Sequence, residues 1–441
     1  MNKSLREFLR YVSLNVLGML GLSCYILADT FFVARGLGSQ GLAALNLAIP
    51  VYSFIHGCGL MLGMGGATRY TILRHQGRRQ DGDAAFTHTL GLGLALAAAL
   101  LALGIAASGP IARWLGADGE VFAMSRTYLQ VLLLFSPAFL LNDALLCFVR
   151  NDGAPQLSML AMVAGSLSNV VLDYIFIFPL DMGIFGAVLA TGLTPVISLA
   201  VLSPFFFRRR NRFRPARCRP SARLAWTIAG CGLPSLVTEV SSGVVMILFN
   251  AIILRLQGNL GVAAYGVIAN LSLVVVALYT GIGQGIQPLA SRSFGQSRLD
   301  EVRRLARYGL ALVLGLSAAL YALIAAGAGP IVAAFNREGN PVLQAIAEKG
   351  MRLYFLGSTF AGVNILLCVL FTCLDWVRPA QVIAVLRGFA ILAPSALLFS
   401  RLWGMTGLWL AFPVTEAVVM AVSLFWYRRV DVFPMDVSVG L

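Results

Sequence analysis

The sequence predicts an all-α integral membrane protein with twelve transmembrane helices in two pseudo-symmetric six-helix lobes around a central cleft. This fold class rests on an apolar composition, twelve apolar segments of spanning length and a repeat that relates the two halves. Of 441 residues, 59% are hydrophobic and 12% are charged, with a mean hydropathy of +0.82. Soluble domains are nearer ~45–50% apolar and ~25% charged, so the composition excludes a soluble or disordered protein.

Twelve apolar segments are long enough to cross ~30 Å of hydrocarbon, which takes about 20 helical residues. Helices, not barrel strands, fit these lengths. The first segment has no small-residue cleavage site after it, so we expect it to remain in the mature protein. The remaining residues leave no room for a soluble enzyme domain. The segments lie near residues 12–34, 45–73, 87–107, 123–148, 157–179, 183–207, 226–254, 264–291, 307–327, 351–374, 380–399 and 404–427.

The basic residues predict the orientation in the membrane. With an inside N-terminus, 23 of them fall in inner loops and tails and eight in outer loops. Lysine and arginine concentrate on the cytoplasmic side, so we expect a multi-pass protein of the plasma or inner membrane with both termini in the cytoplasm. The net charge of +14 is therefore that of a membrane-side surface, and we expect no nucleic-acid partner.

The densest basic stretch, from Arg208 to Arg219, lies almost at the chain midpoint. We expect residues 1–207 to form an N-lobe with helices 1–6, residues 208–223 a basic cytoplasmic linker, and residues 224–441 a C-lobe with helices 7–12. The linker arginines either act as an orientation signal in a solvated loop or bind anionic lipid headgroups.

A shift of 220 residues superimposes the two halves. It places Arg35 on Arg255, Gly38 on Gly258, and Gly109-Pro110-Ile111 on Gly329-Pro330-Ile331. Six spans is an even number, so both halves enter the membrane in the same orientation, related by an axis along the membrane normal. Parallel repeats of this type build transporters with a central cavity.

Glycines cluster in the second span of each half, as Gly63-x-Gly65-Gly66 and Gly281-x-Gly283-x-Gly285. No phosphate-binding glycine motif is present, so these runs indicate close helix packing. The seven cysteines show neither a disulfide pattern nor metal-ligand spacing, and we expect no cofactor.

Four polar residues of the first repeat lie at overlapping depths in the outer half of the membrane: Asp29, Asn169, Asp173 and Thr191. An ionisable group at mid-helix costs at least ~2.5–3.5 kcal/mol, so such a group needs a partner or water. Asn169 and Asp173 are four residues apart and share a helix face. Two carboxylates, an amide and a hydroxyl in a low dielectric suit a proton or a dehydrated Na⁺. The alternative is that Asp29 and Asp173 only form hydrogen bonds to other helices or lie at the membrane interface.

In the second half, Glu239 and Glu416 lie about thirteen residues into their spans, near the midplane. Three roles remain open for them. They hold a cationic substrate, form a second coupling site, or brace helices loosened by Pro234 and Pro413.

The other ionisable residues in or near the spans favour structural interpretations. Asp143 and Asp375 lie close to cytoplasmic helix ends, where we expect them to be solvated. His56 is a lone histidine, more typical of packing than of a proton relay. Arg69 and Arg387 lie toward cytoplasmic ends, where arginine reaches the interface. The embedded acids thus outnumber the bases, which predicts a lipophilic cation as substrate.

Several motifs carry a resemblance to a known family. They are the run from Asp29 to Gly38, the Asn169-x3-Asp173 pair, Gly232-Leu233-Pro234 followed by Glu239, and the run from Gln284 to Leu289. These resemble the multidrug and toxic compound extrusion (MATE) family over nearly the whole chain. The resemblance implies two six-helix lobes around a cleft, and a secondary active antiporter that exports organic cations or other amphipathic compounds in exchange for H⁺ or Na⁺ by alternating access.

The resemblance also implies roles for individual residues. The family's N-lobe cation site corresponds to Asp29, Asn169, Asp173 and Thr191, and its C-lobe glutamate to Glu239. At an offset of 221 residues Asp173 pairs with Pro394, so the second lobe has no copy of that site. We therefore expect ion coupling in the first lobe.

Other classes of protein fit the sequence less well. A lipid-linked saccharide flippase of the same superfamily is the first alternative, but it calls for a strongly cationic cavity. An intramembrane enzyme would need a motif such as HExxH or GxSxG, and neither is present. An ion channel would not need an asymmetric carboxylate site. We expect a monomer in the lipid bilayer that binds small molecules.

Overall fold

The computed structural model describes residues 3–336 and 339–432. Arg337, one of the eight basic residues expected in outer loops, lies outside the described residues. The regular secondary structure of the described residues is helical. The elements are α1 (Lys3–His75), α2 (Arg79–Trp114), α3 (Gly119–Leu134), α4 (Ser136–Asn151), α5 (Pro155–Ile177), α6 (Gly183–Phe207), α7 (Ala222–Gly295), α8 (Leu299–Phe335), α9 (Pro341–Tyr354), η1 (Phe355–Gly357), α10 (Ser358–Cys373), α11 (Val377–Val385), η2 (Leu386–Ala390) and α12 (Leu392–Val432).

Three long helices are broken by glycines with positive φ angles. The break in α1 is at Gly38 (φ 64°, ψ −156°), the break in α7 at Gly258 (φ 63°, ψ −155°) and that in α12 at Gly404 (φ 59°). Only glycine adopts such angles readily. Because Gly38 and Gly258 share nearly the same dihedral angles 220 residues apart, the repeat seen in the sequence has a structural counterpart.

Other spans are assembled from shorter pieces. Helices α3 and α4 meet at Phe135 with a bend of 48° and together make the fourth span. Helices α9 and α10 make the tenth, and α11, the π-helical η2 and the first part of α12 make the eleventh. With α1 and α7 counted as two spans each, the described residues make the twelve predicted passes. Helix α6 has the predicted bounds, 183–207.

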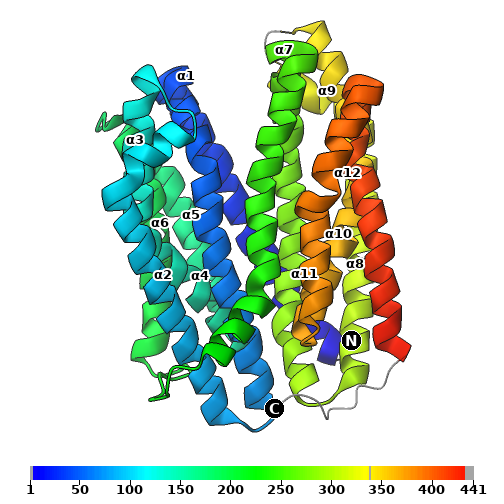
Figure 1. Ribbon diagram of the computed structural model, residues 1–441. Coiled ribbons are helices and arrows are strands. Elements are labelled where there is room, and N and C mark those ends of the chain that lie inside the picture. The colour runs from blue at the N-terminus through cyan, green and yellow to red at the C-terminus, as the bar shows by residue number, and fades with distance from the viewer. Residues whose placement is uncertain (1–2, 337–338, 433–441) are drawn as a thin grey trace.

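The twelve passes form two lobes, α1–α6 and α7–α12, whose ribbons diverge toward the top of Figure 1. The start of α1 and the linker lie at the lower ends of the helices, which we call the linker side. On this side the first span of each lobe reaches into the other lobe. Phe8 and Val12 are buried in the hydrophobic core of the second lobe, and Ile228 of α7 packs with Leu73 and Ala85 of the first.

Glycines permit this exchange of helix ends. A Cβ atom on Gly232 would overlap the carbonyl oxygen of Met61, and one on Gly65 would overlap the carbonyl oxygen of Ile228. In the second lobe a Cβ on Gly285 would lie 2.7 Å from Val12 Cα. The glycine runs therefore serve close helix packing, as the sequence predicted.

The linker differs from the solvated loop that the sequence suggested. Its backbone docks on the first lobe, where Arg212 N–H donates to Asp152 Oδ2 (2.7 Å) and Arg214 N–H donates to Asp83 Oδ1 (3.1 Å). Phe213 is fully buried in an aromatic cluster that includes Phe86 (ring centroids 4.6 Å apart). The linker arginines themselves remain exposed. Phe213 and the two backbone hydrogen bonds thus anchor the linker, and its exposed arginines form a basic surface.

Candidate functional site

The predicted polar residues of the first lobe lie together. Asp29 comes from the first half of α1, Asn169 and Asp173 from α5, and Thr191 from α6, and all four are buried. In the amide orientation that satisfies both neighbours, Asn169 Nδ2 donates to Asp173 Oδ2 (3.0 Å) and its Oδ1 accepts from the Thr191 backbone N–H (3.3 Å). The Thr191 hydroxyl donates to the Ala187 carbonyl (3.2 Å).

Two carboxylate oxygens in this group have no hydrogen-bond partner among the described residues. They are Oδ1 of Asp29 and Oδ1 of Asp173, and both are buried. The two carboxyl groups are close enough for their charges to interact. Such a pair in a low dielectric needs a proton or a cation to offset its mutual repulsion and desolvation. The arrangement therefore provides a buried acceptor for a positive charge.

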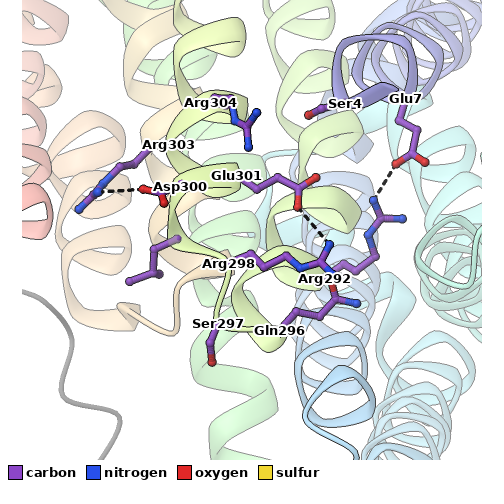
Figure 2. Close-up of a pocket in the computed structure, with 11 residues that line it drawn as sticks. Ser4, Glu7, Arg292, Gln296, Ser297, Arg298, Asp300, Glu301, Arg303 and Arg304 are labelled. Carbon is purple, nitrogen blue, oxygen red and sulfur yellow. Dashed lines mark hydrogen bonds and ion pairs between the residues drawn. The ribbon is translucent and has the colours of Figure 1, made fainter. Parts of the chain in front are cut away.

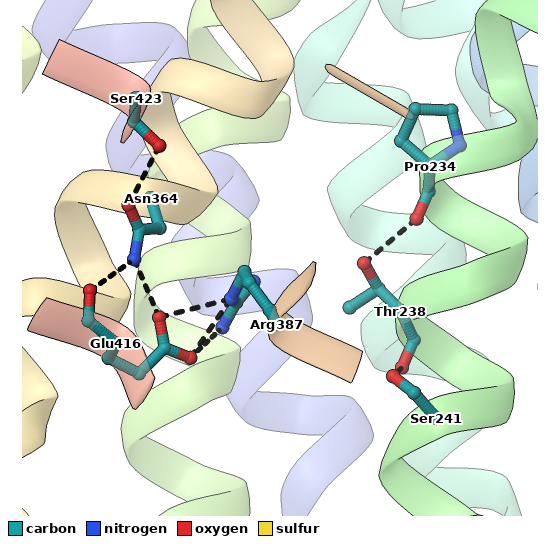
Figure 3. Close-up of polar contacts among 7 residues, drawn as sticks. All are labelled: Pro234, Thr238, Ser241, Asn364, Arg387, Glu416 and Ser423. Atoms are coloured by element: carbon teal, nitrogen blue, oxygen red, sulfur yellow. Dashed lines mark hydrogen bonds and ion pairs between the residues drawn. The ribbon is translucent and has the colours of Figure 1, made fainter. Parts of the chain in front are cut away.

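In the second lobe Glu416 has the opposite environment. Arg387 binds its carboxylate in a forked geometry, with Nε 2.9 Å and Nη2 2.9 Å from Oε1. Asn364 Nδ2 donates to Glu416 Oε2 (2.7 Å), and Ser423 donates to the Asn364 carbonyl oxygen (3.0 Å). Figure 3 shows this chain of contacts between α10, η2 and α12. Every carboxylate oxygen has a protein donor, which favours the bracing role for Glu416.

This network corrects our expectation for Arg387. We expected the side chain to reach the cytoplasmic interface, but it is only 13% exposed and is paired with Glu416. The π-helical turn of η2 carries Arg387, and a π-turn shifts the register of the residues that follow it. The positive charge thus stays inside the lobe. Arg69 has a different partner, Asp375 of the second lobe, at 3.0 Å.

Glu239 of α7 is half-buried and faces the first lobe. A Cβ atom on Gly57 of α1 would lie 3.1 Å from Glu239 Cβ. No described residue donates a hydrogen bond or an ion pair to its carboxylate. One turn earlier, Pro234 cannot donate to the Gly230 carbonyl, and Gln381 of α11 supplies that bond instead (3.0 Å). The carboxylate of Glu239 is therefore available to bind a cation, and the Gln381 bond supports the helix that carries it.

The structure also overturns our expectation for Asp143. We expected solvation, but Asp143 is 5% exposed, and its Oδ2 lies 2.9 Å from His56 Nδ1. His56 is therefore not a lone packing residue. The bend between α3 and α4 at Phe135 brings this part of α4 against α1.

One buried charge was missed from the sequence. Arg150, at the linker-side end of α4, is 1% exposed, although we counted it among the loop residues. Its Nη1 donates to Asn15 Oδ1 (2.8 Å) and to Gln284 Oε1 (2.8 Å) of the second lobe. Gln287 in turn donates to Thr68 Oγ1 of the first lobe (2.7 Å). The glutamines of the Gln284–Leu289 run could have indicated this buried charge, because they supply hydrogen-bond acceptors within the membrane.

These contacts join the two lobes near the linker side. The Arg69–Asp375 ion pair lies in the same region. A third link is the ion pair between Glu7 of α1 and Arg292 of α7 (2.6 Å), which Figure 2 shows at the edge of a surface hollow of about 950 Å³. The hollow lies among helix ends and contains none of the predicted site residues. The lobes are therefore held together by polar contacts on one side of the molecule.

The chain matches the MatE family model over residues 16–175 and 234–396. The protein belongs to the MATE family. It is 25% identical over 422 residues to the multidrug export protein MepA of Staphylococcus saprophyticus, covering 93% of this chain and 91% of the relative. It is 26% identical over 426 residues to MepA of Staphylococcus aureus, covering 94% and 91%.

Solved structures share the MATE fold with this chain. A MATE transporter in complex with MaL6 superposes with a TM-score of 0.91 at 24% identity, covering 98% of this chain and 97% of the other. An outward-facing multidrug resistance MATE transporter gives 0.90 at 23% identity, covering 98% and 97%. A MOP superfamily transporter from Pyrococcus furiosus, described as having a binding pocket of reverse polarity, also gives 0.90 at 23% identity, covering 97% and 96%.

Membership of the MATE family makes the protein a multi-pass membrane transporter for small molecules. It confirms the prediction that the chain is not an enzyme, and the prediction of twelve helices in two lobes. MATE transporters work by ion coupling and need no cofactor.

Proposed function

We propose that this MATE transporter acts as a monomer in the plasma membrane and exports amphipathic organic cations in exchange for H⁺ by alternating access. The linker side of the molecule and both termini face the cytoplasm. The two curated relatives are named for multidrug export, which supports the substrate class. The basic linker surface supports the orientation.

The unpaired carboxylate oxygens of Asp29 and Asp173 carry the choice of coupling site. Asn169 turns its amide nitrogen toward Asp173, and a donor in that position suits a protonatable carboxyl better than a Na⁺ ion, which needs oxygen ligands. These features favour H⁺ over Na⁺.

Glu239 is the proposed contact for the cationic part of the substrate. Its carboxylate is half-buried and has no protein cation bonded to it, whereas Glu416 is neutralised by Arg387. We propose that Glu416 acts only as a brace. The flippase alternative would need a cationic cavity, but Arg69 and Arg387 are each paired with a carboxylate. Arg150 bonds to the neutral acceptors Asn15 and Gln284, and a single arginine does not make a strongly cationic cavity.

Transport by purified protein in vesicles tests the proposal. Ethidium efflux should follow an imposed pH gradient and should not follow an imposed Na⁺ gradient. Asp29→Asn and Asp173→Asn should each remove the response to the pH gradient, because an amide cannot titrate. Preferential export of an anionic dye of similar size would instead favour the flippase.

A further inference from the structure

The first lobe contains an internal chamber of about 60 Å³ on the linker side of the Asp29–Asp173 group. Its walls come from both halves of α1, from α4, α5 and α6, and from Gln284 of α7. On α5 the wall residue Ser166 is one turn from Asn169, and on α6 Thr194 is one turn from Thr191. The chamber therefore lies directly below the acidic group.

The chamber is lined by charged and polar groups. The His56–Asp143 pair lies on one wall and Arg150 on another. Three buried lining atoms have no hydrogen-bond partner among the described residues: Oδ1 of Asn142, Nε of Arg150 and Oγ of Ser198. Their side chains are nine-tenths buried or more. Buried polar atoms of this kind bind internal water. A water needs about 10–15 Å³ of such space, so the chamber has room for several.

Two tyrosines that are bonded to each other lie near both the acidic group and His56. Tyr25 lies one turn from Asp29 on α1, and its hydroxyl is 2.6 Å from the hydroxyl of Tyr52. The Tyr52 ring stacks on His56, with the ring centroids 5.9 Å apart and an interplanar angle of 11°. Tyr25 is within electrostatic reach of Asp29, Asp173 and Asp143. The polar groups thus continue from the outer half of the lobe to the chamber.

The charged groups that face His56 come from several elements. Asp143 of α4 binds Nδ1, and Glu239 of α7 is within electrostatic reach. Tyr52 is its neighbour on α1, with Tyr25 bonded behind it. Arg150 lines the same chamber. Two carboxylates beside one imidazole favour a bound proton, while Nε2 remains available to exchange it.

We propose that His56 and Asp143, with the water of this chamber, form a second proton-binding station between the Asp29–Asp173 group and the linker side. The proton leaves a carboxyl of that group and passes through internal water and the tyrosine hydroxyls, each of which accepts one proton and releases its own. Water of the chamber delivers it to Nε2 of the His56 imidazole, and Asp143 stabilises the resulting cation. Chamber water takes it on, which restores neutral His56. This role rests on the proposed coupling to H⁺.

Net transport and substrate exchange separate this role from a packing role. Vesicles containing His56→Gln or Asp143→Asn are compared with wild type in two assays: ethidium efflux driven by a pH gradient, and exchange of ethidium against ethidium without a gradient. Loss of a proton-transfer group typically costs about 100-fold or more, so net efflux should fall by that factor. Exchange should stay near the wild-type rate because it needs no net proton movement.

The matched control is His75→Gln, the same change further along α1 and away from the chamber; both rates should stay near those of wild type. Wild-type net efflux by His56→Gln would overturn the proposal. So would an equal loss of both activities, which is the result expected of a packing residue.

A spectroscopic measurement on the wild-type protein does not depend on the folding of the chamber variants. The chain has only three histidines, so selective ¹⁵N labelling gives few signals, and His75→Gln and His88→Gln identify that of His56. The His56 signal should change its protonation state within the pH range over which transport occurs. A constant state across that range would overturn the proposal.

Driving the wild-type protein with each gradient alone tests the underlying function. Export driven by Na⁺ and not by pH would overturn proton coupling, and with it the role of the chamber. Proton-driven export that is unaffected in His56→Gln would overturn the chamber alone.

Discussion

The two lobes share a backbone plan but treat their buried acids in opposite ways. In the first lobe Asp29 and Asp173 each leave a buried oxygen without a donor. In the second lobe Glu416 receives Arg387 and Asn364, and the Asn364 oxygen is in turn occupied by Ser423. The proposed function therefore assigns ion binding to one copy of the duplicated fold and bracing to the other.

The two arrangements also differ in how the desolvation of the buried carboxylates is offset. A buried ion pair with good geometry and further hydrogen bonds has its desolvation offset within the protein. Buried carboxyls without a bonded protein cation must instead bind a proton or a cation from solution. Under the proposed function, the first-lobe group changes its occupant during a transport cycle, whereas Glu416 keeps a fixed partner.

The largest effect that would test this comparison is loss of coupling in the first lobe. Asp173→Asn should reduce pH-driven ethidium export to the level of empty vesicles, since the amide keeps the shape but cannot release a proton. The protein should remain folded in the membrane, as judged by its elution as a single species in detergent. Asp118→Asn, an exposed residue at the start of α3, is the matched control and should transport normally. Undiminished export by Asp173→Asn would break the comparison.

The next effect is on stability in the second lobe. Removing one partner of a buried pair costs about 3–5 kcal/mol, so Arg387→Met should lower the free energy of unfolding by that amount. Adding Glu416→Leu to Arg387→Met should recover much of the loss, because no buried charge is then left unpaired. Thermal unfolding in detergent measures both. A stable Arg387→Met protein that fails to transport would show that Glu416 is functional and that both lobes use their acids.

A smaller effect is expected at Glu239, which resembles the first-lobe acids in having an available carboxylate. Glu239→Gln should weaken binding of a monovalent organic cation by about tenfold, or ~1.4 kcal/mol, while a neutral analogue of the same size binds nearly as before. Competition binding with the cation and the analogue provides the internal control. An equal loss for both ligands would make Glu239 a packing residue.

The smallest expected effect is on the pH dependence of stability. It distinguishes Asp152 from Asp375, which follow the fourth and tenth spans. Burial raises the pKa of Asp152, whereas Asp375 is paired with Arg69. A raised native pKa means that the folded protein binds the proton more tightly, so stability falls as pH rises from the ordinary Asp value through the native one. Asp152→Asn should flatten the Tm between these pH values, and an unchanged slope would contradict the assignment.

Depth along the chain was enough to predict which residues meet in the first-lobe group. The helical rise per residue is fixed, so Asp29, Asn169, Asp173 and Thr191 could be placed at one level from their positions in the spans. The residues also come from neighbouring helices, and three of them are joined by direct hydrogen bonds. Their role in coupling stays a prediction.

Pairs of side chains on different helices could not be predicted in the same way. Such pairs depend on how each helix is rotated about its axis and on local breaks in the helices. His56 meets Asp143 about two turns after the bend at Phe135, and Arg387 meets Glu416 from a π-helical turn. Pro137 and Pro394 lie next to these breaks and signal a kink, but a proline does not set how far the helix rotates. Arg150 was missed because a helix end near the interface was taken for a loop, although the partner lobe covers it. The domain limits at 208–223 stay a prediction.

The exchanged helix ends have a consequence for how the chain is made. Val12 and Val16 rest against Gly285 and Gly281, and Phe8 lies 5.7 Å from the ring of Tyr308. These partners leave the ribosome well over half a chain length later. The first helix to enter the membrane therefore waits with its inner end unpacked until the eighth and ninth arrive. Biosynthesis of the first lobe is completed by the second, and a chain truncated at the linker lacks the surface that seats its own N-terminus.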